Sequence, residues 1–227
     1  MIMKKVVFIL SGGELGDPLF FREEAVKIAP AALICADGGA RHLLDSGMVP
    51  SLIVGDMDSL DQVSQDRYES MGARIIRHPR EKNETDTEIA LKEAFAMTPS
   101  EVWIWGALGH RIDHILANIS LLIQGNRQGI EVKLIDPWCE VFLITRRRVI
   151  EGEVGQTVSF FPFGGEASGI TLRGFEYPLT KALMEVGSPY GVSNRLMERQ
   201  GIIEVDTGIL LVVRYFRPGV FPGEEGK

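Results

Sequence analysis

The sequence places two aspartates, Asp56 and Asp58, directly after a short apolar run at 52–54 and the glycine that ends it. Such a run is typical of a fully buried strand in a parallel sheet. In an extended backbone, residues two apart point to the same side, so both carboxylates would face one point. Two converging acids suit a hard divalent cation, usually Mg2+ shared with phosphates. The simpler alternative is an acidic turn in which Asp56 caps the next helix, and the spacing alone does not decide between them.

Two glycine-containing loops follow other apolar runs. Residues 11–16, Ser-Gly-Gly-Glu-Leu-Gly, match neither the dinucleotide-binding pattern nor the P-loop pattern, so they could either bring backbone N–H groups to phosphate oxygens or form a plain turn. Asp37, Gly38 and Gly39 directly follow the run at 32–36. The two glycines would give close access to the backbone, which suits a loop that faces a ligand; a turn with a helix N-cap is the alternative.

The segment 82–88, Lys-Asn-Glu-Thr-Asp-Thr-Glu, precedes an amphipathic run that predicts a helix. Thr85 and Glu88 have the spacing of a capping box, which accounts for the helix start. Capping does not account for Asp86 near Lys82. A helix N-terminus beside a lysine would bind phosphate, and Asp86 could add to a metal site, so the capping and binding interpretations can both hold.

Residues 106–114, Gly-Ala-Leu-Gly-His-Arg-Ile-Asp-His, lead into a helix predicted over 115–123. Four apolar side chains are expected to form its core face: Ile112, Ile115, Leu116 and Ile119. His110, His114 and Asn118 fall at four-residue spacing on another face. Histidines at this spacing could hold a transition metal, but no glutamate completes a zinc motif, and hydrogen-bonded structural histidines are the commoner case.

Two charged residues of the same segment have chemistry suited to phosphoryl transfer. Arg111 is always cationic, and its forked guanidinium could stabilise charge on a phosphoryl group. Asp113 could orient an alcohol nucleophile or accept its proton.

These loops depend on a regular alternation of strands and helices. Six apolar, β-rich runs are predicted as strands: 6–10, 32–36, 52–54, 74–77, 101–105 and 131–135. Helical patterns separate them, and one of these begins with Asp17 as N-cap and Pro18 in the first turn. The alternation predicts an α/β domain with an open, mostly parallel sheet of about six strands, whose ligands bind beyond the carboxyl ends of the strands.

Beyond Pro137 the pattern changes to short β-rich runs separated by glycines. They lie at 141–145, 158–161, 170–172, 202–205 and 209–214, whereas 179–186 could be helical. Most of this region is therefore predicted to be an all-β sandwich or barrel. We place the boundary at Thr145, which gives domains at 1–145 and 146–227.

The composition is that of a soluble globular protein. The 227 residues are 45% hydrophobic and 24% charged, and the net charge of −7 argues against a general nucleic-acid or membrane-surface binder. Cys35 and Cys139 have no CxxC spacing, so neither a disulfide framework nor a zinc site is indicated. The N-terminal apolar run is too short for a signal peptide, and no run has membrane-spanning length, which predicts a cytoplasmic protein.

Taken together and in order, the four polar loops resemble those of thiamine pyrophosphokinases. The matching stretches are 36–40, 55–59, 82–86 and 109–114, and the segments 11–14, 174–179 and 193–194 are also similar. The resemblance covers nearly the whole chain, and the four motifs are specific together although each alone is not. It implies a parallel α/β domain followed by an all-β domain, a homodimer, and transfer of pyrophosphate from ATP to the hydroxyl of thiamine, giving thiamine diphosphate and AMP.

The resemblance also implies roles for individual residues. The catalytic residues would be Asp56, Asp58, Asp86, Arg111 and Asp113, of which the first three would hold Mg2+. ATP would be bound by Asp37, Gly38, Lys82, Thr85, Arg111, His114 and Asn118. Thiamine would lie in a cleft at the dimer interface, and its ligands would be Asp113, Ser193, Asn194 and Tyr190. An aromatic partner for the cationic thiazolium or the pyrimidine is expected on physical grounds, with Tyr190 and Trp138 as candidates.

One position departs from the family pattern. Asn83 stands where many bacterial relatives have an aspartate, which puts in doubt a direct metal role there but not the reaction. Two other functions remain open: a pyrophosphokinase for a different alcohol, such as a hydroxymethylpterin, and a non-catalytic nucleotide-binding or regulatory module. The module is disfavoured because the acids of the loops would repel one another without a metal.

Overall fold

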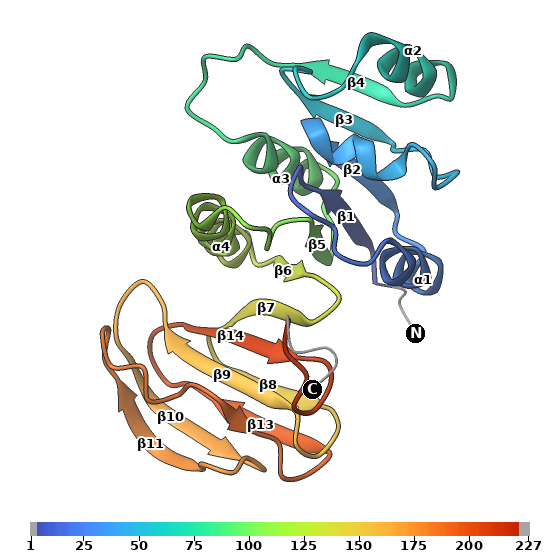
Figure 1. Ribbon diagram of the computed structural model, residues 1–227. Helices are drawn as coiled ribbons and strands as arrows, with labels where there is room; N and C mark the ends of the chain where they lie inside the picture. Colours follow the sequence, from blue (N-terminus) through green and yellow to red (C-terminus); the bar gives the residue numbers. More distant parts are fainter. Residues whose placement is uncertain (1–3, 223–227) are drawn as a thin grey trace. The chain divides into compact units, whose positions relative to one another are not determined.

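The computed structural model describes residues 4–222, which divide into two compact units (Figure 1). Unit 1 is Met1–Pro137 and unit 2 is Trp138–Lys227. The division falls before the boundary that we placed at Thr145, because the strand β7 (Cys139–Ile144) pairs with β14 (Leu210–Tyr215) inside unit 2.

Unit 1 is built on a parallel sheet, as predicted. Its strands are β1 (Val6–Leu10), β2 (Ala32–Ala36), β3 (Leu52–Gly55), β4 (Arg74–Arg77), β5 (Glu101–Trp105) and β6 (Glu131–Ile135). They lie in the order β6-β5-β1-β2-β3-β4, and each described pair is parallel. The central strands are buried along their whole length, which explains their continuous apolar sequences.

The helices of unit 1 are α1 (Pro18–Ile28), the short 3₁₀ helix η1 (Asp37–Leu43), α2 (Gln62–Ser70), α3 (Asp86–Ala96) and α4 (Ile112–Gln128). A side-chain cap starts α1, α2 and α3, whereas η1 and α4 begin without one. Asp17 accepts hydrogen bonds from the first turn of α1, and Thr85 Oγ1 accepts one from Glu88 N at 3.1 Å. Within residues 4–222, none of the helices combines the length and apolar character that crossing a bilayer requires.

The prediction of which side chains form the core face of the helix after residue 111 is wrong. The helix α4 starts at Ile112, three residues earlier than predicted, and the side chains of Ile112 and Leu116 are exposed. The buried face is instead formed by Asn118, Leu121, Leu122 and Gly125. Gly125 sets this rotation, since a Cβ there would lie 2.2 Å from a methyl group of Val132 on β6.

Aromatic side chains fill the core on one side of the sheet in unit 1. The ring centroids of Phe21 from α1 and Trp105 from β5 lie 5.2 Å apart, and Phe8 from β1 lies 5.5 Å from Trp105. All three are almost completely buried. This packing holds α1 against β1 and β5, the strands that precede two of the cleft loops.

Unit 2 is an antiparallel β structure. Its other strands are β8 (Arg147–Glu151), β9 (Thr157–Pro162), β10 (Ala167–Arg173), β11 (Leu179–Met184), β12 (Asn194–Arg195) and β13 (Gln200–Glu204). They pair in the orders β12-β9-β14-β7 and β11-β10-β13-β8. Side chains of both groups, among them Phe160 of β9 and Leu172 of β10, share one apolar core.

The prediction that 179–186 could form a helix is wrong. Leu179–Met184 is β11, which pairs with β10 through two register shifts. Pairing with a neighbouring strand supplies backbone hydrogen bonds that the local sequence does not reveal.

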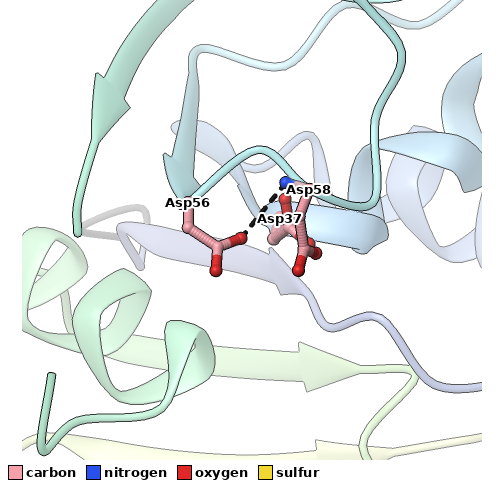
Figure 2. A group of neighbouring side chains, drawn as sticks. All are labelled: Asp37, Asp56 and Asp58. Atoms are coloured by element: carbon pink, nitrogen blue, oxygen red, sulfur yellow. Dashed lines mark hydrogen bonds between the residues drawn. The ribbon is translucent and has the colours of Figure 1, made fainter. Parts of the chain in front are cut away.

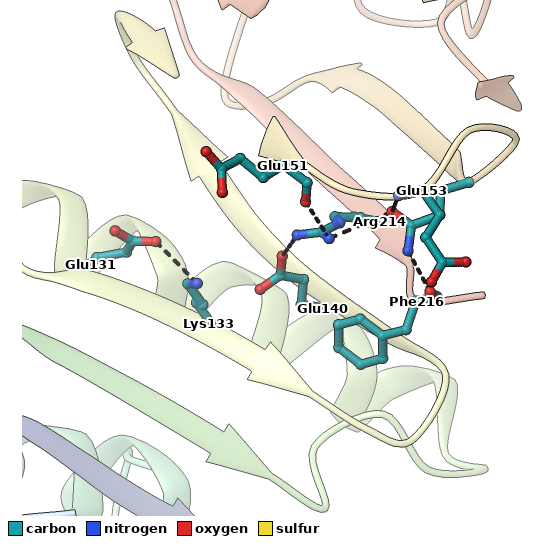
Figure 3. A network of polar contacts seen from close by, with 8 residues as sticks. Glu131, Lys133, Glu140, Glu151, Glu153, Arg214 and Phe216 are labelled. Carbon is teal, nitrogen blue, oxygen red and sulfur yellow. Dashed lines mark hydrogen bonds and ion pairs between the residues drawn. The ribbon is translucent and has the colours of Figure 1, made fainter. Parts of the chain in front are cut away.

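A partly buried ion pair joins β14 to β7 in unit 2 (Figure 3). Arg214 on β14 lies 3.1 Å from the carboxylate of Glu140 on β7, and its second nitrogen donates to Glu151 O at 2.7 Å. Gln156 donates to Phe216 O beside them. These partners engage both terminal nitrogens of Arg214 and compensate the charge of the buried Glu140, whereas Arg214 Nε has no hydrogen-bond partner among the described residues. We assign the group a structural role.

Tyr68 of α2 provides a first test of how the fold positions its loops. Its buried hydroxyl donates to Ala40 O in η1 at 2.9 Å, and burial raises its pKa to about 12. Tyr68→Phe would leave this carbonyl without its donor, so we expect the free energy of unfolding to fall by about 1–2 kcal/mol in urea titrations. Ser70→Ala is the control, because its bond to Arg67 O is exposed and water can replace it. Equal losses in both variants would contradict the role of the buried bond.

Candidate functional site

A cleft of about 620 Å³ lies beyond the carboxyl ends of the strands in unit 1. Its walls come from the loops after β1, β2, β3, β4 and β5 and from the start of α3. The predicted site residues that line it are Asp37, Gly38, Asp56, Lys82, Thr85, Asp86, Arg111, His114 and Asn118. The parallel topology therefore gathers loops that are far apart in the sequence.

Backbone contacts between glycines hold the floor of this cleft. Gly13 N donates to Gly106 O at 3.1 Å, and a Cβ at Gly13 would lie only 2.4 Å from that oxygen. Ser11 N donates to Trp105 O at 2.8 Å. The glycine loop after β1 is thus tied to the loop after β5, and only glycine allows this approach.

Three aspartates form an acidic cluster at the cleft (Figure 2). Asp37, Asp56 and Asp58 each offer a carboxylate oxygen within 4.8 Å of the others. The pleat of a strand is not what brings Asp56 and Asp58 together, contrary to our expectation. Met57 has a left-handed backbone (φ 63°), and Asp58 N donates to Asp56 Oδ1 at 3.1 Å, so a tight turn aims the two carboxylates. The cap of α2 is Asp61, which excludes the alternative in which Asp56 caps that helix.

Asp37 is the buried member of the cluster. Its side chain is 6% exposed, and Oδ1 has no hydrogen-bond partner among the described residues. Burial raises the pKa of Asp37, the charges of Asp86, Asp56 and Asp58 raise it further, and a hydrogen bond from Ser59 opposes them. Gly55 makes room for this carboxylate, since a Cβ at that position would lie 2.6 Å from the Cβ of Asp37.

Asp86 stands apart from the group of three. It is the first residue of α3, and its carboxylate forms an ion pair with Lys82 at 2.9 Å. Lys82 also donates to Pro79 O at 3.3 Å. Asp86 is close enough for its charge to raise the pKa of Asp37, so it lies at the edge of the acidic cluster.

Arg111 and Asp113 are bound to each other. The guanidinium makes two hydrogen bonds to the Asp113 carboxylate, at 2.5 and 3.2 Å. Arg111 holds the pKa of Asp113 below its usual value, and Asp113 in turn raises the pKa of Arg111. Asp113 is therefore a poor proton acceptor in this arrangement, although it can still accept a hydrogen bond.

Two arginines of the cleft were missed by the sequence reasoning. Arg41 lies on η1 and donates to Gly38 O at 3.3 Å, and Arg80 follows β4 and lies 3.9 Å from the carboxylate of Asp58. The spacing of Arg80 and Lys82 could have indicated a pair of cations on one side of the loop. Together with Lys82 and Arg111 they give the cleft four cationic side chains among its lining residues.

The two histidines at four-residue spacing do not form a metal site. His110 precedes α4, is exposed, and lies 2.8 Å from the carboxylate of Glu14. His114 is exposed on the first turn, and Asn118 is buried and donates to Ala107 O at 3.0 Å. Among the described residues, the group suited to a metal ion is the three aspartates.

The predicted thiamine residues belong to unit 2. Asn194 is buried and uses its amide group to hold the backbone of Tyr177, with Oδ1 accepting at 3.0 Å and Nδ2 donating at 2.9 Å. Ser193 is exposed, and its N–H donates to Ser159 Oγ at 3.0 Å. Tyr190 is half exposed and donates to Leu183 O. Trp138 is partly buried, and its carbonyl accepts from Phe216 N at 2.8 Å.

The fold and the cleft together define an α/β protein with a site suited to phosphoryl transfer, joined to an all-β unit. Residues 27–134 match the family model for the thiamin pyrophosphokinase catalytic domain, and residues 146–210 match the one for the thiamin pyrophosphokinase vitamin B1 binding domain. The chain is 33% identical to thiamine pyrophosphokinase of Bacillus subtilis (strain 168) over 183 residues, which are 80% of this chain and 86% of that protein. The chain belongs to the thiamine pyrophosphokinase family.

Solved structures agree with this assignment over both units. The crystal structure of thiamine pyrophosphokinase from Bacillus subtilis superposes with a TM-score of 0.83 at 29% identity, covering 93% of this chain and 99% of that one. Thiamin pyrophosphokinase from Geobacillus thermodenitrificans gives 0.80 at 26% identity, covering 95% and 100%. The yeast enzyme, at 19% identity and a TM-score of 0.77, shows the same fold with coverage of 94% and 87%.

Because negative charge is crowded at Asp37, we expect that removing its charge raises the stability of the metal-free protein and weakens metal binding. Asp37→Asn removes one buried charge without changing the shape of the side chain. In the presence of EDTA we expect its midpoint of thermal unfolding to rise by roughly 2–4 °C, which corresponds to about 1 kcal/mol in a chain of this length. Mg2+ binding, measured by calorimetry, should weaken at the same time.

Asp66→Asn is the control, since Asp66 is exposed on α2. A midpoint that stays the same or falls in Asp37→Asn would show that the buried carboxylate is not repelled in the metal-free protein.

Proposed function

We propose that this chain transfers a pyrophosphate group from ATP to the hydroxyl of thiamine, giving thiamine diphosphate and AMP. The observation that carries the proposal is the cluster of Asp37, Asp56 and Asp58, of which Asp37 and Asp56 line the cleft, in a member of this family. Such a cluster would be costly to maintain in a protein with no cation to bind there.

We propose Mg2+ as the metal of this cluster. The donors are all carboxylate oxygens, which suit a hard cation, and the buried Oδ1 of Asp37 lacks a hydrogen-bond partner among the described residues. Asp56 and Asp58 would hold the ion with Asp37, and Asp86 would join them on release from Lys82. When bound, Mg2+ neutralises charge that develops on the phosphate oxygens.

The cations of the cleft would hold the phosphate chain. Arg41, Arg80, Lys82 and Arg111 all line the cleft. The N-terminus of α3, which begins at Asp86, adds backbone N–H groups at the same place. Rates in this chemistry depend on positioning and charge neutralisation and need no covalent intermediate on the protein.

The transfer forms one bond and breaks another. The hydroxyl oxygen of thiamine bonds to the β-phosphorus of ATP, and the bond from that phosphorus to the oxygen shared with the α-phosphate breaks, so AMP leaves with this oxygen. The hydroxyl proton is lost to solvent. Because its pKa is lowered, Asp113 would orient the hydroxyl by accepting its hydrogen bond and would not serve as the base.

Unit 2 would recognise thiamine, and two copies of the chain would form a homodimer in the cytoplasm. Residues 146–210 match the vitamin B1 binding family model. Large apolar side chains are exposed on both units, among them Ile112, Leu116, Val186, Tyr190 and Met197. Exposed apolar groups of this kind are typical of surfaces that a partner copy covers.

The deciding experiment measures AMP formation from ATP and Mg2+ with and without thiamine, with the product identified by mass. We expect AMP and thiamine diphosphate to appear together and only with thiamine. If AMP forms with another primary alcohol and not with thiamine, that alcohol would be the substrate in place of thiamine. Binding of ATP without any turnover would support a non-catalytic binding module.

The acidic cluster can be tested separately with Asp56→Ala. Loss of a metal-binding carboxylate should lower kcat by roughly 100-fold or more, while circular dichroism shows an intact fold. Asp66→Ala, on the exposed face of α2, should keep normal turnover. An Asp56→Ala variant with most of its activity would remove Asp56 from the site.

The role of Asp113 can be tested with Asp113→Asn, which keeps a hydrogen-bond acceptor and loses the charge. We expect kcat to fall roughly 10- to 100-fold through poorer positioning. The pH profile should keep its shape between about pH 6 and 9, because the pKa of the wild-type carboxyl lies below this range. A lost acidic limb in the variant would show that Asp113 accepts the proton.

A further inference from the structure

Two buried hydroxyl groups join two walls of the cleft. Ser11 Oγ and Thr87 Oγ1 lie 2.9 Å apart, although the residues are 76 positions apart in the sequence. Ser11 is 3% exposed and Thr87 is 8% exposed, so water has little access to either group. Each hydroxyl therefore depends on the other as its hydrogen-bond partner.

The bond lies between two sets of backbone donors. Ser11 directly precedes Gly12 and Gly13 of the glycine loop, and Thr87 is the second residue of α3, next to Asp86. All five residues line the cleft. In the first turn of a helix the N–H groups have no intrahelical acceptor, so those of Asp86 and Thr87 are available to a ligand. In the glycine loop, the N–H groups of Gly12 and Glu14 donate to no acceptor among the described residues and are available in the same way.

The other hydrogen bonds of the glycine loop lead away from α3. Ser11 N and Gly13 N donate to the carbonyls of Trp105, the last residue of β5, and Gly106, which follows it. Gly13 O lies 2.8 Å from Nε2 of His42 on η1. Among the hydrogen bonds within residues 4–222, the one between Ser11 and Thr87 is the direct link from this loop to the start of α3.

We infer that the hydrogen bond between Ser11 and Thr87 positions the glycine loop against the first turn of α3, so that both sets of N–H groups keep the separation that the phosphate chain of ATP requires. Both are positioning residues, and neither contacts the reacting atoms. The inference rests on the proposed function for the identity of the nucleotide. A misplacement of about 1 Å between two groups that bind one ligand is enough to lower affinity and rate.

Four variants isolate this bond. Ser11→Ala and Thr87→Val each remove one hydroxyl, and Thr87→Val nearly keeps the volume of the side chain. The double variant removes both hydroxyls, and Thr87→Ser keeps the bond. Ser64→Ala is the matched control, because Ser64 is also buried in unit 1 and its Oγ donates to Asp61 Oδ2 at 2.8 Å on α2.

The main readout is the affinity for a non-hydrolysable ATP analogue with Mg2+, measured by calorimetry, together with the KM for ATP and for thiamine. We expect each single variant to bind the analogue roughly tenfold more weakly, and the double variant to bind no more weakly than the single ones, since one bond is lost in all three. Thr87→Ser should bind within about twofold of the wild type. The KM for thiamine should not change, and Ser64→Ala should lower the thermal midpoint without changing analogue affinity.

Three results would overturn the inference: wild-type affinity in both single variants, additive losses in the double variant, or an equal loss of affinity in Ser64→Ala. If Ser11→Ala does not fold, the comparison of analogue affinity between Thr87→Val and Thr87→Ser tests the inference by itself. A wild-type protein that binds the analogue but makes no AMP with thiamine would refute the proposed substrate, and the analogue affinities would still test the positioning role.

Discussion

Repulsion among three carboxylates is the constraint on which the arrangement of unit 1 depends. Asp37, Asp56 and Asp58 offer oxygens within 4.8 Å of one another, and Asp37 is buried. Such a group persists only where the surrounding structure resists its separation. Here the resistance comes from fully buried parallel strands, from the missing side chain at Gly55, and from the left-handed turn at Met57. The stability of the sheet thus maintains an arrangement that is unfavourable by itself.

The sheet of unit 1 could be predicted because its signal is local. A strand buried on both faces must be apolar throughout, and the glycines and aspartates that end it mark the loops. The same argument predicted that ligands bind beyond the carboxyl ends of the strands, and the loops that carry Asp37 and Asp56 do line a cleft there. The composition of the acidic cluster was not predicted. The sequence analysis grouped Asp86 with Asp56 and Asp58, whereas the structure places the buried Asp37 with them, and the turn that aims Asp56 and Asp58 was not foreseen.

The features that could not be predicted depend on contacts between distant segments. The apolar spacing of α4 fits more than one rotation of the helix, and Gly125 against Val132 selects the rotation that leaves Ile112 exposed. The sequence 179–184 has no clear strand pattern, and it forms a strand because it pairs with β10. Arg41 and Arg80 line the cleft because of where η1 and the loop after β4 lie. No sequence motif indicates these positions.

The bidentate contact between Arg111 and Asp113 would link the two proposed substrates to each other. While the guanidinium is bound to Asp113, two of its nitrogens and both carboxylate oxygens are engaged. If Arg111 turned to the phosphates of a nucleotide, Asp113 would lose its cation, its pKa would return toward the ordinary value, and its oxygens could accept further hydrogen bonds. Arrival of the nucleotide would therefore prepare the place of the acceptor alcohol, so that a preferred order of binding is built into two residues on one turn of the chain.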